Sequence, residues 1–257
     1  MRTVVVTGSA SGIGKATKAL LEARGDRVIG VDIRDADITV DLTTAEGRAA
    51  LVDQVQALTG GRIDAIVANA GLAHSTPATI AVNYFGTVAT LEGLRPLLAG
   101  SAAPRAVATA SMASLFPVDA ELVDLCLAGD EAGALARAAV VADGDDANVI
   151  YSSSKVALCR WLRRNAATPA WAGAGIPVNA IAPGMVETPM VADLIATEEQ
   201  RAGIRELVPM PLNGFMGPGS PAALIAWLIS VENTHLCGQV VFIDGGSDVV
   251  IRGESTW

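Results

Sequence analysis

The chain has 257 residues, 51% of them hydrophobic but only 4% aromatic, and a formal net charge of −9. This length suits one large α/β domain, and the apolar fraction excludes a disordered chain. The negative charge would repel a phosphate backbone, so no nucleic-acid partner is expected.

Short β-rich segments alternate with helical segments along the chain. We predict strands at Thr3–Thr7, Arg27–Asp32, Ile38–Val40, Ile63–Ala68, Ala106–Thr109, Val178–Ile181 and Val240–Ile243. We predict helices at Gly12–Arg24, Thr44–Leu58, Tyr151–Ala167 and Pro221–Ser230. This alternation predicts an α/β fold: a single domain with a doubly wound, Rossmann-like parallel sheet and right-handed crossovers. Ligands of such sheets bind at the carboxyl ends of the strands, where the winding reverses.

A glycine-rich turn joins the first strand to the first helix and includes Gly8, Ser11, Gly12, Ile13 and Gly14. The first glycine permits a tight turn, the second leaves space for a pyrophosphate, and the third lets the helix pack closely on the strand. The free N–H groups at the start of the helix would then face the phosphates. The spacing is G-x3-G-x-G, and the alternative interpretation is a glycine-rich turn with no ligand.

Two acidic positions follow the next strands. Asp32 ends the second strand, where a carboxylate can accept hydrogen bonds from the ribose hydroxyls of a dinucleotide. The alternative is a solvated turn aspartate. Asp41 and Leu42 follow the third strand and could border an adenine ring. For Asp41, an ordinary helix N-cap is an equal alternative.

Tyr151 and Lys155 are spaced i and i+4 in a predicted helix, so they share a face. A free tyrosine titrates near ~10, and a nearby ammonium favours the phenolate and lowers the pKa of the tyrosine. Such a pair can take a proton from an alcohol or give one to a developing alkoxide. The spacing alone is common among ordinary surface residues.

With the remaining motifs in place, the chain resembles the short-chain dehydrogenase/reductase family over nearly its whole length. The residues that carry the resemblance are the turn at 7–14, Asn69-Ala70-Gly71, Asn83, Ser111, Tyr151, Lys155, Pro183-Gly184 and Thr188. The resemblance implies an NAD(H)-dependent oxidoreductase that interconverts a ketone and a secondary alcohol.

The resemblance also implies roles for the catalytic residues. Ser111 would hydrogen-bond the substrate oxygen, with Ser114 as the nearest alternative. Tyr151 would be the acid/base, and Lys155 would lower its pKa and hold the nicotinamide ribose. Asn83 would anchor a water that relays protons to Lys155.

The cofactor residues follow from the same resemblance. Asn69-Ala70-Gly71 would line the cofactor cleft, and Pro183-Gly184 with Thr188 would hold the nicotinamide end. NADP-using members carry a basic residue at one of two places, which here are Ser11 and Ile33. Neither is basic, so NAD is the expected cofactor.

Two departures from the family pattern stand out. Ala68 replaces the first Asn of the usual Asn-Asn-Ala-Gly, which is a minor change. Ser111 and Tyr151 are 40 positions apart, which is far longer than in most members and indicates an insertion at about 117–148. This layout is similar to the bacterial 3α-hydroxysteroid dehydrogenase/carbonyl reductase branch of the family. That likeness implies fold and cofactor better than substrate, because pocket residues vary freely on one scaffold.

The insertion carries eight acidic residues and Arg137 as its one basic residue, a net charge of −7. Two short helices are expected, separated by Gly129 as a helix stop and Asp130 as an N-cap. Their apolar inner faces would be Leu122, Leu125 and Cys126, then Leu135, Ala138 and Ala139. The insertion should cover the usual association surface on the Tyr151 helix. The usual four-helix interface should then be absent, leaving a homodimer through the last helix and strand, around 221–230 and 240–243, with a homotetramer as the other assembly left open. The alternative is a surface loop that changes nothing.

The segment 189–216 is expected to be a lid over the substrate. Its apolar residues suggest a small, neutral, hydrophobic substrate such as a steroid or another cyclic carbonyl compound, with core packing as the alternative; they are Met190, Val191, Leu194, Ile195, Ile204, Leu207, Val208, Met210, Leu212, Phe215 and Met216. Arg201 and Arg205 could bind an anionic group, but solvated helix charges are the favoured explanation.

Other functions remain open alternatives. One is a non-catalytic NAD-binding regulator, against which the complete Ser111, Tyr151 and Lys155 set argues. Others are a dehydrogenase acting on an unrelated small alcohol, and epimerisation or dehalogenation on the same fold.

Metal binding, disulfides and membrane insertion are not expected. The chain has two histidines and no Cys/His cluster, so no metal site is predicted. Cys126, Cys159 and Cys237 are scattered, which fits free thiols in a reducing cytoplasm. No apolar run reaches the roughly 18 residues of a membrane span, and the first residues do not form a signal peptide.

Overall fold

The computed structural model describes residues 1–144 and 146–256, and contains one seven-stranded sheet. Asp145, one of the acidic residues of the insertion, lies outside the described residues. The strands are β1 (Thr3–Thr7), β2 (Arg27–Asp32), β3 (Ile38–Thr39), β4 (Ala65–Ala68), β5 (Arg105–Thr109), β6 (Val178–Pro183) and β7 (Val240–Ile243). All pairings are parallel, in the order β3-β2-β1-β4-β5-β6-β7. The predicted doubly wound sheet is therefore confirmed.

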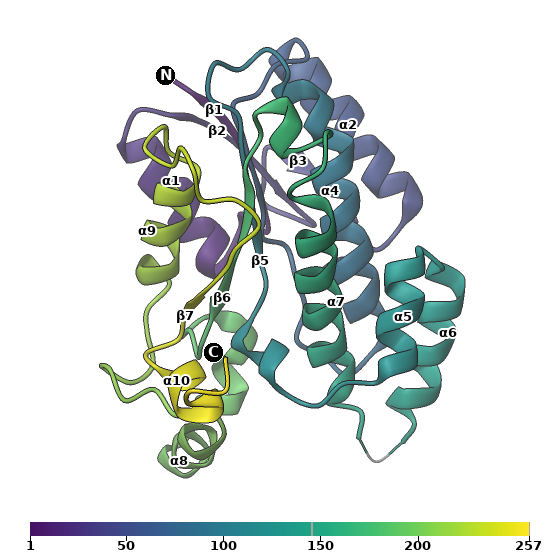
Figure 1. Ribbon diagram of the computed structural model, residues 1–257, viewed down its shortest axis with the longest axis vertical. Coiled ribbons are helices and arrows are strands. Elements are labelled where there is room, and N and C mark those ends of the chain that lie inside the picture. The colour runs from purple at the N-terminus through teal and green to yellow at the C-terminus, as the bar shows by residue number, and fades with distance from the viewer. Residues whose placement is uncertain (145, 257) are drawn as a thin grey trace.

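Helices cover both faces of the sheet (Figure 1). One face carries α1 (Gly12–Ala23) and α9 (Gly219–Leu228), and the other carries α2 (Ala45–Thr59), α4 (Thr87–Leu94) and α7 (Val149–Asn165). Successive side chains of a strand point to opposite faces. Val4 and Val6 of β1 accordingly pack in the core beneath α1 and α9, while Val5 packs in the core beneath the other layer. Burial on both faces explains why the strands are continuous apolar runs.

Several short helices complete the fold. Between β4 and β5 lie α3 (Pro77–Ile80), the π-helix η1 (Ala81–Gly86), α4 and the 3₁₀ helix η2 (Arg95–Leu98). The 3₁₀ helices η3 (Met112–Leu115), η4 (Ala172–Ala174) and η5 (Pro189–Ile195) lie in loops, and α8 (Glu198–Leu207) and α10 (Ser247–Arg252) lie near the C-terminal end. The sequence reasoning named none of these helices. A capping box marks the start of α8, because Thr197 and Gln200 exchange hydrogen bonds there. That signal is readable in the sequence.

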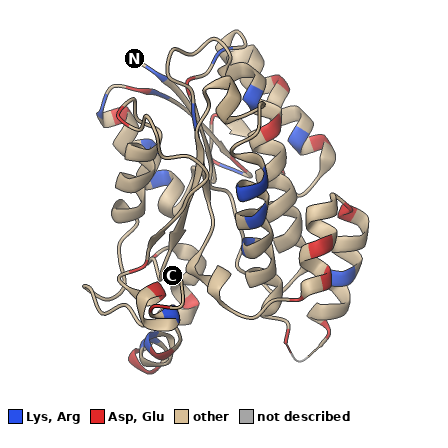
Figure 2. Ribbon diagram, viewed as in Figure 1, with Lys and Arg blue, Asp and Glu red and all other residues tan. Residues whose placement is uncertain are grey.

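The insertion forms the two predicted helices, α5 (Ala120–Ala128) and α6 (Glu131–Ala142). Gly129 ends α5 in the left-handed conformation, and the Asp130 side chain accepts a hydrogen bond from the Gly133 N–H. One predicted inner-face residue is wrong: Ala139 is exposed and Ala134 is buried instead, because α6 turns its Ala134 and Ala138 side toward the core. The insertion packs beside α7 and α3 and carries acidic residues on its outer side (Figures 1 and 2).

Within the described part of the chain, the helices are all too short or too polar to cross a membrane. The same residues contain no cluster of His, Cys, Asp and Glu that could hold a metal ion. The three cysteines are free thiols.

Candidate active site

The site lies where the winding of the sheet reverses, at the carboxyl ends of the adjacent strands β1 and β4. Thr7 ends β1, and its Oγ1 accepts hydrogen bonds from the N–H groups of Asn69 at 2.9 Å and Ala70 at 3.0 Å. The Asn69 side chain returns a bond to the Thr7 carbonyl and accepts one from Thr109 Oγ1 at 3.0 Å. Asn69 therefore ties the ends of β1, β4 and β5 together.

The glycine turn leaves a cradle that side chains would fill. Gly8 and Gly12 adopt positive φ angles of +69° and +51°, a region that L side chains rarely enter. A Cβ on Gly14 would lie 2.0 Å from the Gly8 carbonyl oxygen, and one on Gly12 would lie 3.1 Å from Thr188 Cγ2. The structure thus brings Thr188, predicted for the nicotinamide end, across the turn from Gly12. A turn of this shape fits a dinucleotide pyrophosphate.

Asp32 is held at the end of β2 beside this turn. Its carboxylate accepts hydrogen bonds from the N–H groups of Ala10 at 2.9 Å and Ile33 at 2.7 Å. It therefore places a negative charge next to the turn, which fits ribose hydroxyls better than a phosphate. Ser11 and Ile33 are both exposed, and Ile33 presents 63% of its surface.

Asp41 is not the N-cap of α2, so that alternative is wrong. The N-cap is Thr44, whose hydroxyl accepts a bond from the Gly47 N–H. Asp41 instead closes its own turn by accepting bonds from the N–H and the hydroxyl of Thr43 at 2.8 and 2.7 Å. Leu42 is buried, close to Gly86.

The structure brings Ser111, Tyr151 and Lys155 together. Lys155 Nζ donates to the carbonyl oxygen of Thr109 at 2.9 Å, and lies 5.6 Å from the centroid of the Tyr151 ring. Ser111 is the N-cap of η3, where its Oγ accepts from the Ala113 N–H, and its side chain hydrogen-bonds Tyr151. Both partners of Tyr151 therefore come from the end of β5 or from α7.

Burial dominates the electrostatics of this group. It raises the pKa of Tyr151, and the hydrogen bond with Ser111 only partly offsets that effect. Burial also lowers the pKa of Lys155 to about 8. The expectation that Lys155 brings the pKa of Tyr151 below its free value is therefore wrong for this structure. Loss of water penalises the phenolate, and a lysine that gives up its proton more easily is a weaker cationic partner.

Asn83 lies within the π-helix η1, an irregularity that is frequent at functional sites. Its side chain accepts from the Leu72 N–H at 2.8 Å and donates to the Leu72 carbonyl and to Ser154 Oγ. A Cβ on Gly71 would lie 3.0 Å from Asn83 Oδ1 and 3.8 Å from Lys155 Nζ. The structure thus places Asn83, Gly71 and Lys155 beside one another.

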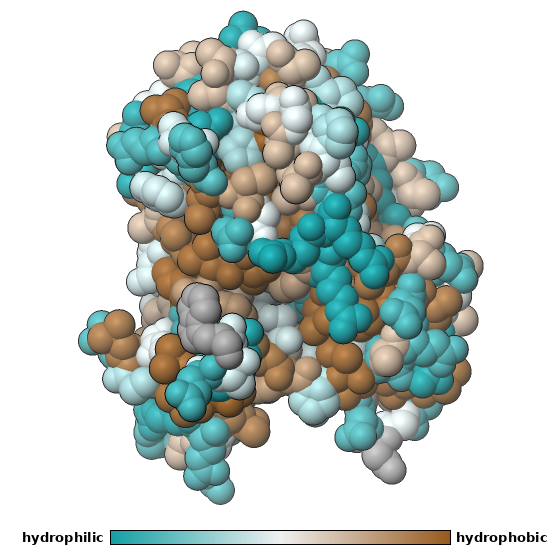
Figure 3. Space-filling model, in the orientation of Figure 1, coloured by the Kyte–Doolittle hydropathy of each residue, from teal (hydrophilic) through white to brown (hydrophobic). Residues whose placement is uncertain are grey.

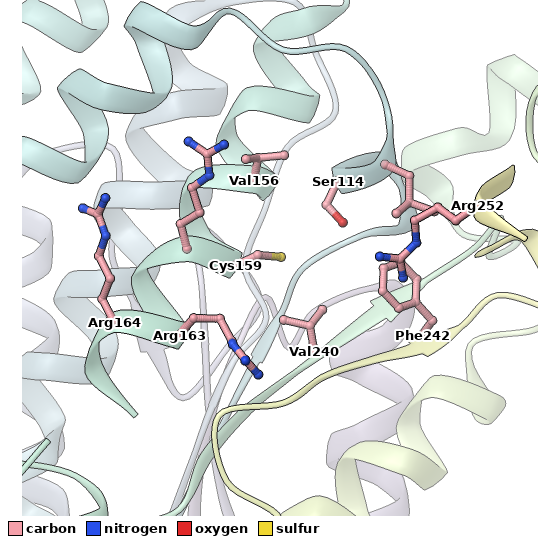
Figure 4. A pocket seen from close by; sticks show the side chains of 10 residues that line it. Ser114, Val156, Cys159, Arg163, Arg164, Val240, Phe242 and Arg252 are labelled. Carbon is pink, nitrogen blue, oxygen red and sulfur yellow. The ribbon is translucent and has the colours of Figure 1, made fainter. Parts of the chain in front are cut away.

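Ser114, the alternative to Ser111, lines a separate hollow of about 480 Å³ between α7, β7 and α10. Figure 4 shows Ser114 beside Cys159, with Val240 and Phe242 of β7 nearby. Burial raises the pKa of the Cys159 thiol to about 11, and its hydrogen bond with Ser114 opposes this effect. None of the four predicted catalytic residues lines the hollow.

The remaining predicted cofactor residues lie at the end of β6. Pro183 is buried, and the Gly184 N–H donates to the carbonyl of Ile243 at 3.0 Å. A Cβ on Gly184 would lie 2.9 Å from Asp244 Cα, so this turn packs against the chain that follows β7.

Only part of the expected lid buries its apolar side chains against the rest of the protein. Met112, Val208 and Met210 form a buried cluster, against which Leu115, Phe116, Met185, Ile204, Phe215, Met216 and Phe242 pack. Four of the apolar residues assigned to the lid are exposed instead: Met190, Leu194, Leu207 and Leu212.

The two lid arginines are already paired. Arg201 binds Glu187 at 2.7 Å and Arg205 binds Glu198 at 2.6 Å. Both guanidinium groups also lie over the Phe215 ring. Because both arginines are in ion pairs, neither is a free anion-binding site.

Sequence reasoning placed Thr7 in the glycine turn without giving it a role, and it missed Thr109 as part of the site. Each supplies the last residue of a strand, and each contacts a predicted site residue, Asn69 or Lys155. The available signal was their position, since the carboxyl ends of parallel strands line the ligand crevice.

Comparisons with known proteins agree with this geometry. Residues 2–123 match the family model for short chain dehydrogenases, and residues 129–248 match the model described as enoyl-(acyl carrier protein) reductase. The 3-alpha-hydroxysteroid dehydrogenase/carbonyl reductase of Comamonas testosteroni is 38% identical, with 98% of each chain covered. The cis-4-hydroxycyclohexanecarboxylate dehydrogenase of Sinomonas cyclohexanicum is 31% identical, with 97% of each covered.

A solved structure is also similar over nearly its full length. The 3-alpha-hydroxysteroid dehydrogenase from Pseudomonas sp. B-0831, in complex with NADH, is 39% identical and superimposes with a TM-score of 0.87. The match covers 98% of this chain and 99% of that one.

Proposed function

Because the chain belongs to the short-chain dehydrogenase/reductase family of oxidoreductases, we propose that it interconverts a hydrophobic ketone and its secondary alcohol with NAD(H). The observation that carries this proposal is the contact of Ser111 and Lys155 with Tyr151 at the end of β5.

Each of these residues has a chemical role in the proposal. Tyr151, which burial keeps protonated, gives its proton to the carbonyl oxygen during reduction and takes it back during oxidation. Ser111 donates a hydrogen bond to the same oxygen and holds it near Tyr151. Lys155, anchored on Thr109, orients the site and stabilises the phenolate when it forms. Asn83 holds the loop after β4 beside Lys155 through Leu72, and supports a proton path to solvent.

The cofactor supplies or accepts the hydride when it is bound. The turn at Gly8, Gly12 and Gly14 would hold its pyrophosphate, with Thr188 closing over it. The negative charge of Asp32 supports NAD(H) over NADP(H), because a 2′-phosphate would meet a like charge. The Pseudomonas relative is an NADH complex, which also supports this choice.

The substrate class rests on the buried cluster around Met112 and Met210, which borders the end of β6 where Gly184 lies. Apolar side chains at this place favour a neutral, hydrophobic substrate. Two of the relatives act, by their names, on hydroxysteroids and on a hydroxycyclohexane carboxylate. A 3-hydroxysteroid or another cyclic carbonyl compound is therefore the proposed substrate class.

The test is to incubate the protein with NADH and a panel of ketones while following nicotinamide absorbance. The panel contains 3-oxosteroids, substituted cyclohexanones, short linear ketones and ketoses. Consumption of NADH with the cyclic ketones supports the proposal. Tight NADH binding without consumption would favour a non-catalytic regulator, and faster turnover of ketoses would overturn the substrate class.

We also propose that the protein assembles as a homodimer through α9 and β7. The insertion covers the N-terminal half of α7, and the exposed Arg160, Arg163 and Arg164 occupy its C-terminal half. A hydrophilic band runs over α7 in the space-filling view, with hydrophobic areas beside it (Figure 3). A symmetric contact through α7 would bring these like charges together. By contrast, α9 exposes 42% of Trp227.

A further inference from the structure

Through Glu131 the insertion reaches Arg48 beside the loop after β3, where Asp41 and Leu42 are expected to border the adenine ring. Glu131, the first residue of α6, binds the guanidinium of Arg48 on α2 through both carboxylate oxygens, with Nη1 to Oε2 at 2.8 Å. These two residues are 83 positions apart in the sequence. The Arg48 side chain is only 11% exposed and that of Glu131 is 33% exposed, so the pair is partly shielded from water.

The same guanidinium holds the backbone of the loop after β3. Arg48 Nε donates to the carbonyl of Leu42 at 2.9 Å, and Nη2 donates to the carbonyl of Thr43 at 3.0 Å. A planar guanidinium with several fixed donors can hold two carbonyls and a carboxylate at once. Glu131 therefore orients Arg48, and Arg48 positions the loop.

Among the described residues of the insertion, only Glu131 has a hydrogen bond or ion pair that leads to this loop. The other polar contacts of the loop after β3 are local: Asp41 bonds Thr43, and the Thr44 hydroxyl donates to the Asp41 carbonyl at 3.1 Å. The start of α2 also packs closely on this loop, since a Cβ on Gly47 would lie 1.9 Å from the Asp41 carbonyl oxygen. A change in the Arg48 position would thus pass directly to the Leu42 backbone.

We propose that Glu131 is a positioning residue for the cofactor, through which the insertion holds the Asp41–Thr43 loop at the adenine end of the site. This inference rests on the proposed function, in which Asp41 and Leu42 border the adenine ring. It assigns the insertion a role in cofactor binding that is independent of assembly.

The test compares Glu131→Gln with Glu121→Gln. Glu121 is also on the insertion and is also paired with an arginine, Arg137, but that pair is far more exposed and touches no cofactor loop. We expect Glu131→Gln to raise the Kd of NADH and the Kd of AMP by the same factor, roughly three- to tenfold. At saturating NADH, kcat and its pH profile should stay unchanged, because the nicotinamide end is not touched. Glu121→Gln should leave both dissociation constants as they are.

A second variant separates positioning from folding. Arg48→Lys keeps the positive charge but cannot reach both carbonyls and the carboxylate, so it should raise both dissociation constants as well. Combined with Glu131→Gln it should add little, because both changes break one linkage. Unchanged Kd values in Glu131→Gln, or a parallel fall in kcat and shift of its pH profile, would overturn the inference. If the unaltered protein binds AMP and NADH too weakly to measure, it is the proposed function that fails.

Discussion

The Lys155 ammonium donates to the carbonyl oxygen of Thr109, the last residue of β5, at 2.9 Å. This bond anchors the lysine where burial makes its charge costly, and its pKa falls to about 8 from a usual 10.5. The helix α7 and the strand β5 are thereby joined at the catalytic group, at a cost in stability that depends on pH.

That cost predicts a pH dependence of unfolding. Between about pH 8 and 10.5 the unfolded state binds the Lys155 proton more tightly than the folded state, so stability rises with pH in this window. Lys155→Met removes this contribution. The stability of the unaltered protein minus that of the variant should therefore increase from about pH 7.5 to 9.5, with a slope of at most about 1.4 kcal/mol per pH unit. Urea unfolding at several pH values measures it, and a flat or falling difference would contradict the assignment.

Tyr151→Phe should reduce turnover by at least ~10²-fold, the lower range for a positioned proton donor. Because the ring is retained, NADH binding should persist, and fluorescence titration checks this. Steady-state reduction of a cyclic ketone measures the loss. Ser114→Ala, in the separate hollow, serves as the control and should keep near-normal activity. Near-normal turnover in Tyr151→Phe would refute its role as the acid/base.

Asp32 should make the enzyme prefer NAD(H). A 2′-phosphate at ~4 Å, with an effective dielectric of about 20, would meet its carboxylate at a cost on the order of several kcal/mol. Even a fraction of this cost gives at least about tenfold higher kcat/KM with NADH than with NADPH. Asp32→Ser should lower the ratio of kcat/KM with NADH to kcat/KM with NADPH. Asp35→Ser, in the exposed turn that follows, should leave this ratio unchanged. Equal kcat/KM with both cofactors in the unaltered protein would refute the claim.

The assembly proposal predicts different effects for substitutions on two faces of the molecule, α9 and α7. Trp227→Asp on α9 should convert the dimer to a monomer, because it places a charge in an apolar contact. Arg164→Glu on α7 should leave the dimer intact. Sedimentation velocity distinguishes the two. Dissociation by Arg164→Glu alone, or cross-links between α7 helices of two copies, would rule out this interface.

Local sequence patterns determined much of the fold. Seven apolar runs predicted the seven strands, with differences of one or two residues at Val40, Ile63, Arg105 and the end of β6. Gly129 and Asp130 predicted the boundary between α5 and α6, since capping depends only on neighbouring residues. The glycine turn and the Tyr151/Lys155 spacing are likewise local sequence patterns, each no longer than about two helical turns. The structure places both of them where ligands bind on such sheets.

The tertiary structure decided what depends on burial and on distant partners. The pKa of Tyr151 rises because the folded chain removes its ring from water, an effect that its i+4 lysine does not reverse. Ala134, not Ala139, faces the core because packing against the neighbouring helices determines which side of α6 is buried. The contact between Arg48 and Glu131 joins residues that share no local pattern. Desolvation and long-range contacts exist only after the chain has folded, so periodicity and spacing could not reveal them.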